Sequence, residues 1–240
     1  MLTDARKAQI SDNYRRILED IAEAKASRGD GGVVDLLAAT KTVPAEEILF
    51  ACDELGLKLV GENRAEEMVS KFDALAGHAE LHLIGTLQRR KVRSIVDKVS
   101  LIESVDSLPL AAEIDKRARD AGVRMRVLVE VNSGREAAKG GVLPEDTAAF
   151  CDELEAFGSL DLAGLMTMAP VCDKKDDYRK YFSQTYQIFI DIFTKKPHNI
   201  REYILSMGMS DSFVPAVLEG ATEVRVGSAI FGARYYPQNL

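Results

Sequence analysis

A lysine at the end of an apolar stretch is the first residue of this chain whose setting suggests chemistry. Lys41 directly follows Leu36-Leu37-Ala38-Ala39-Thr40. A lysine held at a half-buried strand end loses hydration, which lowers its pKa and frees the amine as a nucleophile. Such an amine can form a Schiff base with an aldehyde. The alternative is a lysine whose ammonium group simply reaches solvent.

Two segments near the C-terminus combine hydroxyl groups with glycine: Ser206-Met207-Gly208-Met209-Ser210-Asp211 and Arg225-Val226-Gly227-Ser228. Hydroxyls and closely approaching backbone amides are suited to a phosphate group. Alternatively, Ser210 or Asp211 only caps the short helix that follows. Arg225 should share an inward strand face with Gly227. A buried arginine needs an acceptor, either a carboxylate or a pyridine nitrogen.

Eight apolar runs are predicted to be the strands that position these residues. Near-continuous apolar character is typical of parallel strands covered on both faces, and helical patterns alternate with the runs. The fold expected is a (β/α)8 TIM barrel, and a doubly wound open sheet is the alternative. The predicted strands are Val33–Lys41, Lys58–Asn63, Glu80–Gly85, Val99–Val105, Arg124–Asn132, Asp161–Pro170, Glu202–Ser210 and Glu223–Gly232.

One more helix is expected before the barrel, within residues 1–28. Its apolar positions recur at helical spacing and predict one buried face. No linker-like stretch interrupts the chain, so we expect one domain over residues 1–240. The face consists of Ile10, Tyr14, Ile17, Ile21 and Ala24.

Composition narrows the classes of function. The net charge of −7 argues against a general nucleic-acid binder, because no overall positive field attracts phosphates. The basic cluster Arg89-Arg90-Lys91 with Arg93 is either a solvated surface or a contact for an anion or partner. The three cysteines lie far apart in the sequence, which suggests reduced thiols. The histidines and cysteines do not have the spacing of a metal site. No secretion signal or membrane-spanning stretch is evident, so we expect a cytoplasmic protein.

Several separated motifs, in order, resemble the pyridoxal phosphate homeostasis protein family over nearly the whole chain. The N-terminal half contributes Ala39-Thr40-Lys41, Gly61-Glu62-Asn63 and His82-Leu83-Ile84-Gly85, and Gly164-Leu165-Met166 follows. The most specific matches are Leu205-Ser206-Met207-Gly208-Met209-Ser210 and Val224-Arg225-Val226-Gly227-Ser228-Ala229-Ile230-Phe231-Gly232.

This resemblance implies a barrel like that of alanine racemase, with pyridoxal 5′-phosphate (PLP) at its C-terminal rim. Lys41 would be the Schiff-base lysine, and Arg225 would face the pyridine nitrogen. Lys139, in a loop, matches a further lysine that could receive the cofactor transiently. The phosphate would be held by Ser206, Ser210, Gly227 and Ser228, and the remaining cofactor contacts would come from Asn63, His82 and Met166.

Three functions are compatible with these residues. A PLP-dependent amino-acid racemase needs a base on each face of the substrate carbon, and in the resembled enzyme a second domain supplies one of them. This chain ends shortly after the barrel motif, so we expect cofactor storage and delivery, without robust turnover, to apo forms of PLP-dependent enzymes. The lost second-domain interface favours a monomer. An adaptor that binds nucleic acid or protein through the basic cluster is the third alternative.

Overall fold

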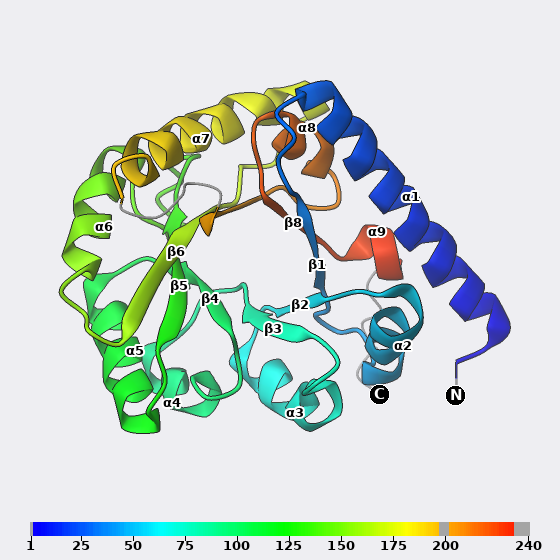
Figure 1. The fold of residues 1–240 in the computed structure, drawn as a ribbon, viewed down its shortest axis with the longest axis horizontal. Helices are drawn as coiled ribbons and strands as arrows, with labels where there is room; N and C mark the ends of the chain where they lie inside the picture. The colour runs from blue at the N-terminus through cyan, green and yellow to red at the C-terminus, as the bar shows by residue number, and fades with distance from the viewer. Residues whose placement is uncertain (1, 197–201, 233–240) are drawn as a thin grey trace.

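The computed structural model describes residues 2–196 and 202–232. Within them, eight parallel strands follow one another in chain order around a closed barrel, and β1 pairs with β8 to close it (Figure 1). The predicted TIM barrel is therefore confirmed, and the open-sheet alternative is wrong. The strands are β1 Asp35–Ala39, β2 Leu59–Glu62, β3 Glu80–Leu83, β4 Leu101–Val105, β5 Met125–Val131, β6 Leu160–Thr167, β7 Ile204–Met207 and β8 Glu223–Val226.

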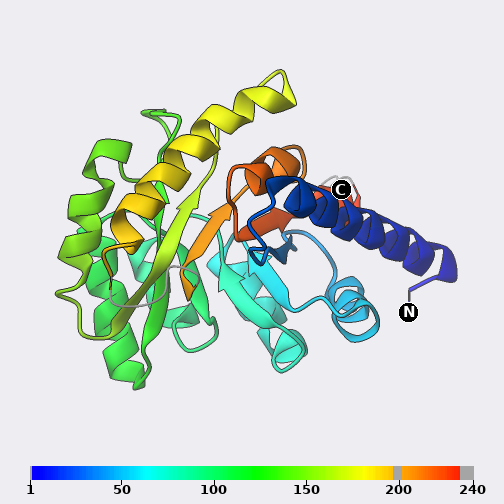
Figure 2. The ribbon, with the colours of Figure 1, turned by 45° about the horizontal axis from the view of Figure 1, so that its top comes forward.

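Helices surround the ring of strands on its outside, as the tilted view of Figure 2 shows. Proline stands at the start of two helices: Pro44 precedes α2, and Pro144 begins the 3₁₀ helix η2. The α-helices are α2 Ala45–Leu55, α3 Ala65–Leu75, α4 Val92–Ile95, α5 Leu108–Ala121, α6 Thr147–Leu154, α7 Arg179–Phe193, α8 Phe213–Leu218 and α9 Ser228–Phe231. The 3₁₀ helices are η1 Arg89–Lys91, η2 Pro144–Asp146 and η3 Lys175–Tyr178.

The additional N-terminal helix, α1 Asp4–Arg28, lies against the outside of the barrel beside α8 and α9 (Figure 1). Thr3 caps its first turn by accepting a hydrogen bond from the Arg6 amide. Gly29 ends it in the left-handed conformation, with φ 74°. Its buried residues are the five that the helical spacing predicts: Ile10, Tyr14, Ile17, Ile21 and Ala24.

Strand β8 ends earlier than the sequence predicts, and this changes the geometry of the candidate site. The predicted strand continued to Gly232, but the chain leaves the sheet after Val226 and forms α9 instead. Gly227 lies so close to β1 that a Cβ atom there would be 2.7 Å from the Ala39 carbonyl oxygen. The expectation that Arg225 and Gly227 share one strand face is therefore wrong, because alternation stops before Gly227.

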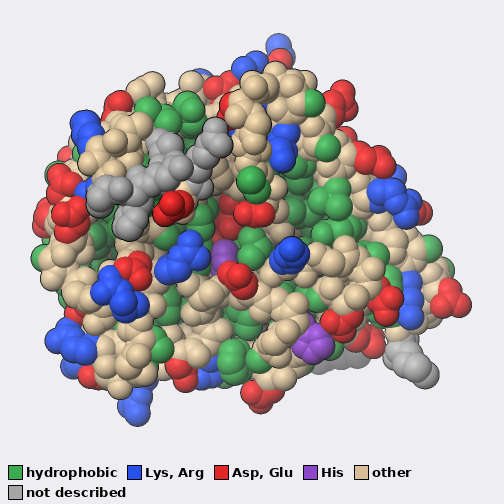
Figure 3. Space-filling view, in the orientation of Figure 1, with side chains coloured by type: hydrophobic (Ala, Val, Ile, Leu, Met, Phe, Trp, Pro, Cys, Tyr) green, Lys and Arg blue, Asp and Glu red, His purple; other side chains and the backbone are tan. Residues whose placement is uncertain are grey.

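Cys52, Cys151 and Cys172 are all free thiols, and burial raises the pKa of Cys151 to about 12. Acidic and basic side chains are interspersed over the face drawn in Figure 3. Of the helices in residues 2–196 and 202–232, none has the length and apolar character that crossing a membrane requires.

Candidate functional site

A cavity of about 430 Å³ opens where β1 and β8 end, at the C-terminal rim of the barrel. Functional groups of such barrels collect at this rim because the loops that follow the strands converge there. The cavity brings together residues that lie far apart in the sequence and that the sequence analysis had selected. They are Lys41, Ser210, Arg225, Gly227 and Ser228.

The strand end that carries Lys41 is held by buried polar contacts. The Thr40 amide donates to the Gly61 carbonyl at 2.9 Å, and the Thr40 hydroxyl donates to Glu62 Oε1 at 2.7 Å. The Lys71 ammonium donates to the Thr40 carbonyl at 2.9 Å and to Glu62 at 2.6 Å. These contacts fix the backbone directly before Lys41, so the position of its Cα atom is well defined.

The residue after Lys41 has a strained backbone. Thr42 has φ 63°, in the left-handed region that β-branched residues rarely adopt. Its amide donates to Glu67 Oε2 at 3.1 Å, which helps to hold this conformation. Strain of this kind persists only where surrounding contacts enforce it, and it clusters at functional sites. The strained turn therefore supports a functional role for the neighbouring lysine.

Hydroxyl and amide groups converge opposite this turn. Ser210 Oγ accepts from the amides of Gly227 and Ala229, each at 3.3 Å, and lies 3.1 Å from Ser228 Oγ. Such a neutral cradle of donors suits a phosphate. The interpretation of Ser210 or Asp211 as a helix cap is wrong, because α8 begins at Phe213 with Ser212 at its N-cap.

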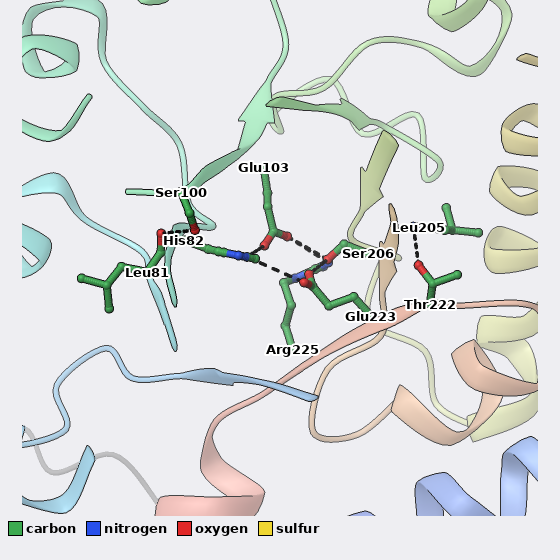
Figure 4. A network of polar contacts seen from close by, with 9 residues as sticks. All are labelled: Leu81, His82, Ser100, Glu103, Leu205, Ser206, Thr222, Glu223 and Arg225. Carbon is green, nitrogen blue, oxygen red and sulfur yellow. Dashed lines mark hydrogen bonds and ion pairs between the residues drawn. The ribbon is translucent and has the colours of Figure 1, made fainter. Parts of the chain in front are cut away.

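Arg225 lies at the floor of the cavity and is 3% exposed. Its Nη1 donates to Ser206 Oγ at 2.6 Å, and its Nη2 donates to the Thr167 carbonyl at 2.8 Å. Ser206 Oγ is also 2.7 Å from Glu103 Oε2 and 2.7 Å from Glu223 Oε1. Figure 4 shows these side chains meeting inside the barrel. The acceptors that the sequence analysis required for a buried arginine are thus present.

Ser206 and His82 lie elsewhere than expected. Both are inside the barrel, neither lines the cavity, and His82 Nδ1 is 2.9 Å from Glu103 Oε1. The expected phosphate contact of Ser206 stays a prediction, and in the structure its hydroxyl is fully buried and surrounded by Arg225 and two carboxylates. The Ser206 hydroxyl accepts a hydrogen bond from Arg225 inside the barrel.

The other sequence-predicted residues are more scattered. Met166 is fully buried in an apolar cluster within the barrel, away from the residues that line the cavity. Lys139 lies in the loop after β5, where it forms an ion pair with Glu136. Asn63 directly follows β2, and its Oδ1 atom is buried without a hydrogen-bond partner among the described residues. The structure therefore does not bring Met166 or Lys139 to the cavity.

Three buried carboxyl groups in this region have shifted pKa values. Burial would raise the pKa of Glu103, but the hydrogen bond with His82 and the charge of Arg225 lower it. Burial and the charge of Glu103 raise the pKa of Glu223 well above its ordinary value. Burial and the charge of Asp106 raise the pKa of Glu130 to about 7, although Arg225 opposes this. The pKa values of Glu103 and Glu223 are therefore shifted in opposite directions.

The sequence analysis missed these carboxyl groups, although a signal existed. Glu103 stands within Leu101-Ile102-Glu103-Ser104-Val105, and Glu130 stands within Val127-Leu128-Val129-Glu130-Val131. An acid within a strand that is covered on both faces must be buried, so it needs a partner or a proton. Arg6 and Glu47 also line the cavity, and nothing local in the sequence indicates that α1 reaches it.

The residues fit a phosphorylated aromatic aldehyde. The cavity offers an amine, a neutral hydroxyl and amide cradle, and a permanent cation, from Lys41, Ser210 with its neighbours, and Arg225.

Comparisons with known proteins agree with this geometry. Residues 9–235 match the family model of the alanine racemase N-terminal domain. The chain is 41% identical over 226 residues to the pyridoxal phosphate homeostasis protein of Aquifex aeolicus, covering 92% of this chain and 96% of the relative. These matches extend over nearly the whole chain, so they include both segments that line the cavity, around Lys41 and around Arg225.

Two solved structures have the same fold. A protein of unknown function from Bifidobacterium adolescentis is 36% identical, with a TM-score of 0.87 over 96% of this chain and 98% of that one. PipY of Synechococcus elongatus, solved with PLP bound, is 32% identical, with a TM-score of 0.74 over 88% of this chain and 100% of that one.

Proposed function

Because this chain belongs to the alanine racemase N-terminal domain family, and to the pyridoxal phosphate homeostasis proteins within it, we propose that it binds PLP and acts in PLP homeostasis. One observation carries the proposal. The cavity at the barrel rim places Lys41 together with the cradle of Ser210, Gly227 and Ser228. An amine for the aldehyde and a phosphate cradle in one cavity are the two features that PLP recognition requires.

Each residue of the cavity has a distinct part in this proposal. Lys41 would hold the aldehyde carbon covalently, while Ser210, Gly227 and Ser228 would hold the phosphate. Arg225 would face the pyridine nitrogen. An arginine is always charged and only donates hydrogen bonds, so it keeps that nitrogen unprotonated. When bound, PLP supplies an electron-withdrawing ring, and an unprotonated nitrogen weakens this property.

The proposal includes binding without robust turnover. Racemisation needs a proton acceptor on each face of the substrate carbon. Among the described residues, no tyrosine, histidine or cysteine lines the cavity. Two carboxylates do line it: that of Glu47, which is paired with Arg6 at 2.6 Å, and that of Asp211. The lack of a tyrosine, histidine or cysteine base in the cavity supports storage and delivery over the alternative of an amino-acid racemase.

The central test uses the purified full-length chain supplied with PLP. We expect a visible absorption band, and borohydride reduction should attach the cofactor permanently to Lys41, as peptide mapping would show. Lys41→Ala should abolish the band. Lys175→Ala, which removes an exposed lysine, is the matched control and should keep it. Full colour in Lys41→Ala, or labelling of another lysine alone, would refute the assignment.

The proposal extends to delivery and to a second lysine. We propose that the protein is a monomer that passes PLP to apo forms of PLP-dependent enzymes, and that Lys139 receives the cofactor transiently. Lys139→Ala should then slow transfer to an apo-enzyme without changing the absorption band. Turnover of L- and D-alanine at the rate of a true racemase would favour the alternative function.

A further inference from the structure

Five polar side chains meet in the interior of the barrel, where apolar residues usually fill such folds. They come from four strands: β3, β4, β7 and β8 (Figure 4). None of the five is more than 3% exposed. Apart from Arg225, none lines the cavity, so they lie beneath it. They are His82, Glu103, Ser206, Glu223 and Arg225.

The hydroxyl of Ser206 determines where one hydrogen must lie. A hydroxyl donates one hydrogen bond and accepts two. Ser206 Oγ has three neighbours: Arg225 Nη1 at 2.6 Å, and one carboxyl oxygen each of Glu103 and Glu223 at 2.7 Å. Arginine can only donate, so it uses one acceptor position. Ser206 can donate to only one carboxyl group, and the other carboxyl group must donate to Ser206.

The neighbours of each acid decide which one carries that hydrogen. Glu103 Oε1 lies 2.9 Å from His82 Nδ1, which donates to it in the tautomer that carries its hydrogen on Nδ1, and Glu103 Oε2 forms an ion pair with Arg225 Nη1 at 3.9 Å. Glu223 Oε2 lies farther from His82 Nδ1, at 3.7 Å. Ser206 therefore donates to an ionised Glu103, and Glu223 is the acid that donates to Ser206.

We propose that Glu103 and Glu223 hold one proton between them, resident on Glu223, and that this pair positions Arg225 for the pyridine nitrogen of the cofactor. The single negative charge balances the charge of Arg225. Only the positioning of Arg225 toward the cofactor rests on the proposed function. The location of the proton is a property of the protein without PLP. The raised pKa of Glu223 and the lowered pKa of Glu103 agree with this assignment of the proton.

Charged groups on the remaining strands complete the surroundings. Asp35 on β1 interacts electrostatically with His82, and Glu130 on β5 interacts with Arg225. From β6, the Thr167 carbonyl accepts from Arg225 Nη2 at 2.8 Å. His82, Glu103 and Glu223 also lie near enough to be considered for a cation. We do not assign one, because Arg225 already supplies a positive charge beside Glu103.

The first experiment locates the proton without using PLP. Infrared spectra of the full-length protein should contain the carbonyl stretch of a protonated, buried carboxyl group at neutral pH. We expect Glu223→Gln to remove part of this band and Glu130→Gln, which removes another buried acid with a raised pKa, to remove a separate part, while Asp115→Asn leaves the band unchanged. Asp115 is a matched control, because it is a buried acid on α5 that pairs with Arg119 and accepts from the Ser159 amide at 2.7 Å. A wild-type spectrum without the band would overturn the proposal.

The second experiment tests the coupling to Arg225. Glutamine mimics a protonated glutamic acid but not an ionised one. Glu223→Gln should leave PLP affinity and the absorption maximum near those of the wild type. Glu103→Gln should weaken PLP binding at least about tenfold, because a hydrogen bond to a charged group is lost and Arg225 is left without its counter-charge. Its absorption maximum should also shift, and a purely structural role would not cause this.

The outcomes separate the two levels of inference. Equal effects of the two glutamine variants would overturn the asymmetric assignment, even if PLP binds as proposed. If Glu103→Gln does not fold, Glu103→Asp, which keeps the charge, should restore folding and part of the affinity. A stoichiometric metal ion that is lost in Glu223→Gln would also overturn the shared proton. An infrared band without the PLP absorption band would support the shared proton and refute the proposed binding of PLP.

Discussion

Two sides of the same barrel interior are built on opposite principles. One side, from β4, β5 and β6, is apolar, and the other, from β3, β4, β7 and β8, is polar. The apolar side gains stability from removing hydrocarbon from water, and it needs no particular partner. Each polar group needs its own acceptor or donor. The apolar side contains Leu101, Leu128, Ala163 and Met166. The polar side contains His82, Glu103, Ser206, Glu223 and Arg225.

Buried glutamates inside the barrel differ according to their neighbours. Glu103, among donors, has its pKa lowered, whereas Glu130 follows Leu128 on β5 and has its pKa raised to about 7 by burial and the charge of Asp106. The comparison teaches that the polar side is ordered by its charges, and the apolar side by packing. Arg225, the proposed ring-nitrogen contact, is on the polar side, so disturbing that side should affect the cofactor as well as stability.

The largest effect is expected from Glu103→Ala. Removing this carboxylate leaves Arg225 as a buried charge without its counter-charge, which costs about 4 kcal/mol of unfolding free energy. Denaturant unfolding at neutral pH measures the loss. A loss below about 1 kcal/mol, the size expected for an exposed pair, would show that Glu103 does not balance Arg225.

On the apolar side, Leu128→Ala should lower the free energy of unfolding by about 3 kcal/mol, because it leaves a cavity in a close-packed interior. Leu128→Met, which conserves volume, should cost less than about 1.5 kcal/mol. PLP affinity, measured by absorption titration, should be unchanged in both variants. A large loss of affinity in Leu128→Met would show that the two sides are not independent.

Glu130 should make stability depend on pH. Its folded pKa of about 7 lies above the unfolded value near 4.5, so its contribution is fully present below about pH 4.5 and is lost as pH rises through 7. The whole loss is about 3.5 kcal/mol, since one pKa unit corresponds to about 1.4 kcal/mol, and about 2–3 kcal/mol of it falls between pH 5 and 8. Glu130→Gln should remove it. We expect the stability difference between variant and wild type to grow between pH 5 and 8; a constant difference would contradict the raised pKa.

The smallest effect concerns the turn after Lys41. Thr42→Gly should raise the free energy of unfolding by about 1 kcal/mol, because glycine adopts the left-handed conformation without steric cost. Thr42→Ala keeps the Cβ atom and should give little gain. Thermal unfolding of the two variants provides the comparison. Equal stability of Thr42→Gly and Thr42→Ala would show that the turn stores no strain.

Local patterns were sufficient for much of the fold. Apolar runs separated by helical stretches indicated all eight strands, and the spacing in α1 gave its buried face. Strand ends were less accurate, as at Gly227, because the close approach of β1 decides where β8 stops. That approach involves Ala39, nearly the whole chain away. Local periodicity contains no information about it.

The sequence by itself determined that Lys41 follows a buried strand and that Ser210, Gly227 and Ser228 recur near strand ends, since these are local properties of the chain. Only the tertiary structure decided that Ser206 meets Glu103, 103 positions away, and that it contacts Arg225 and not the cavity. The physical reason is that closure of the barrel sets which side chains face one another across its interior. Those neighbours then decide which acid keeps its proton.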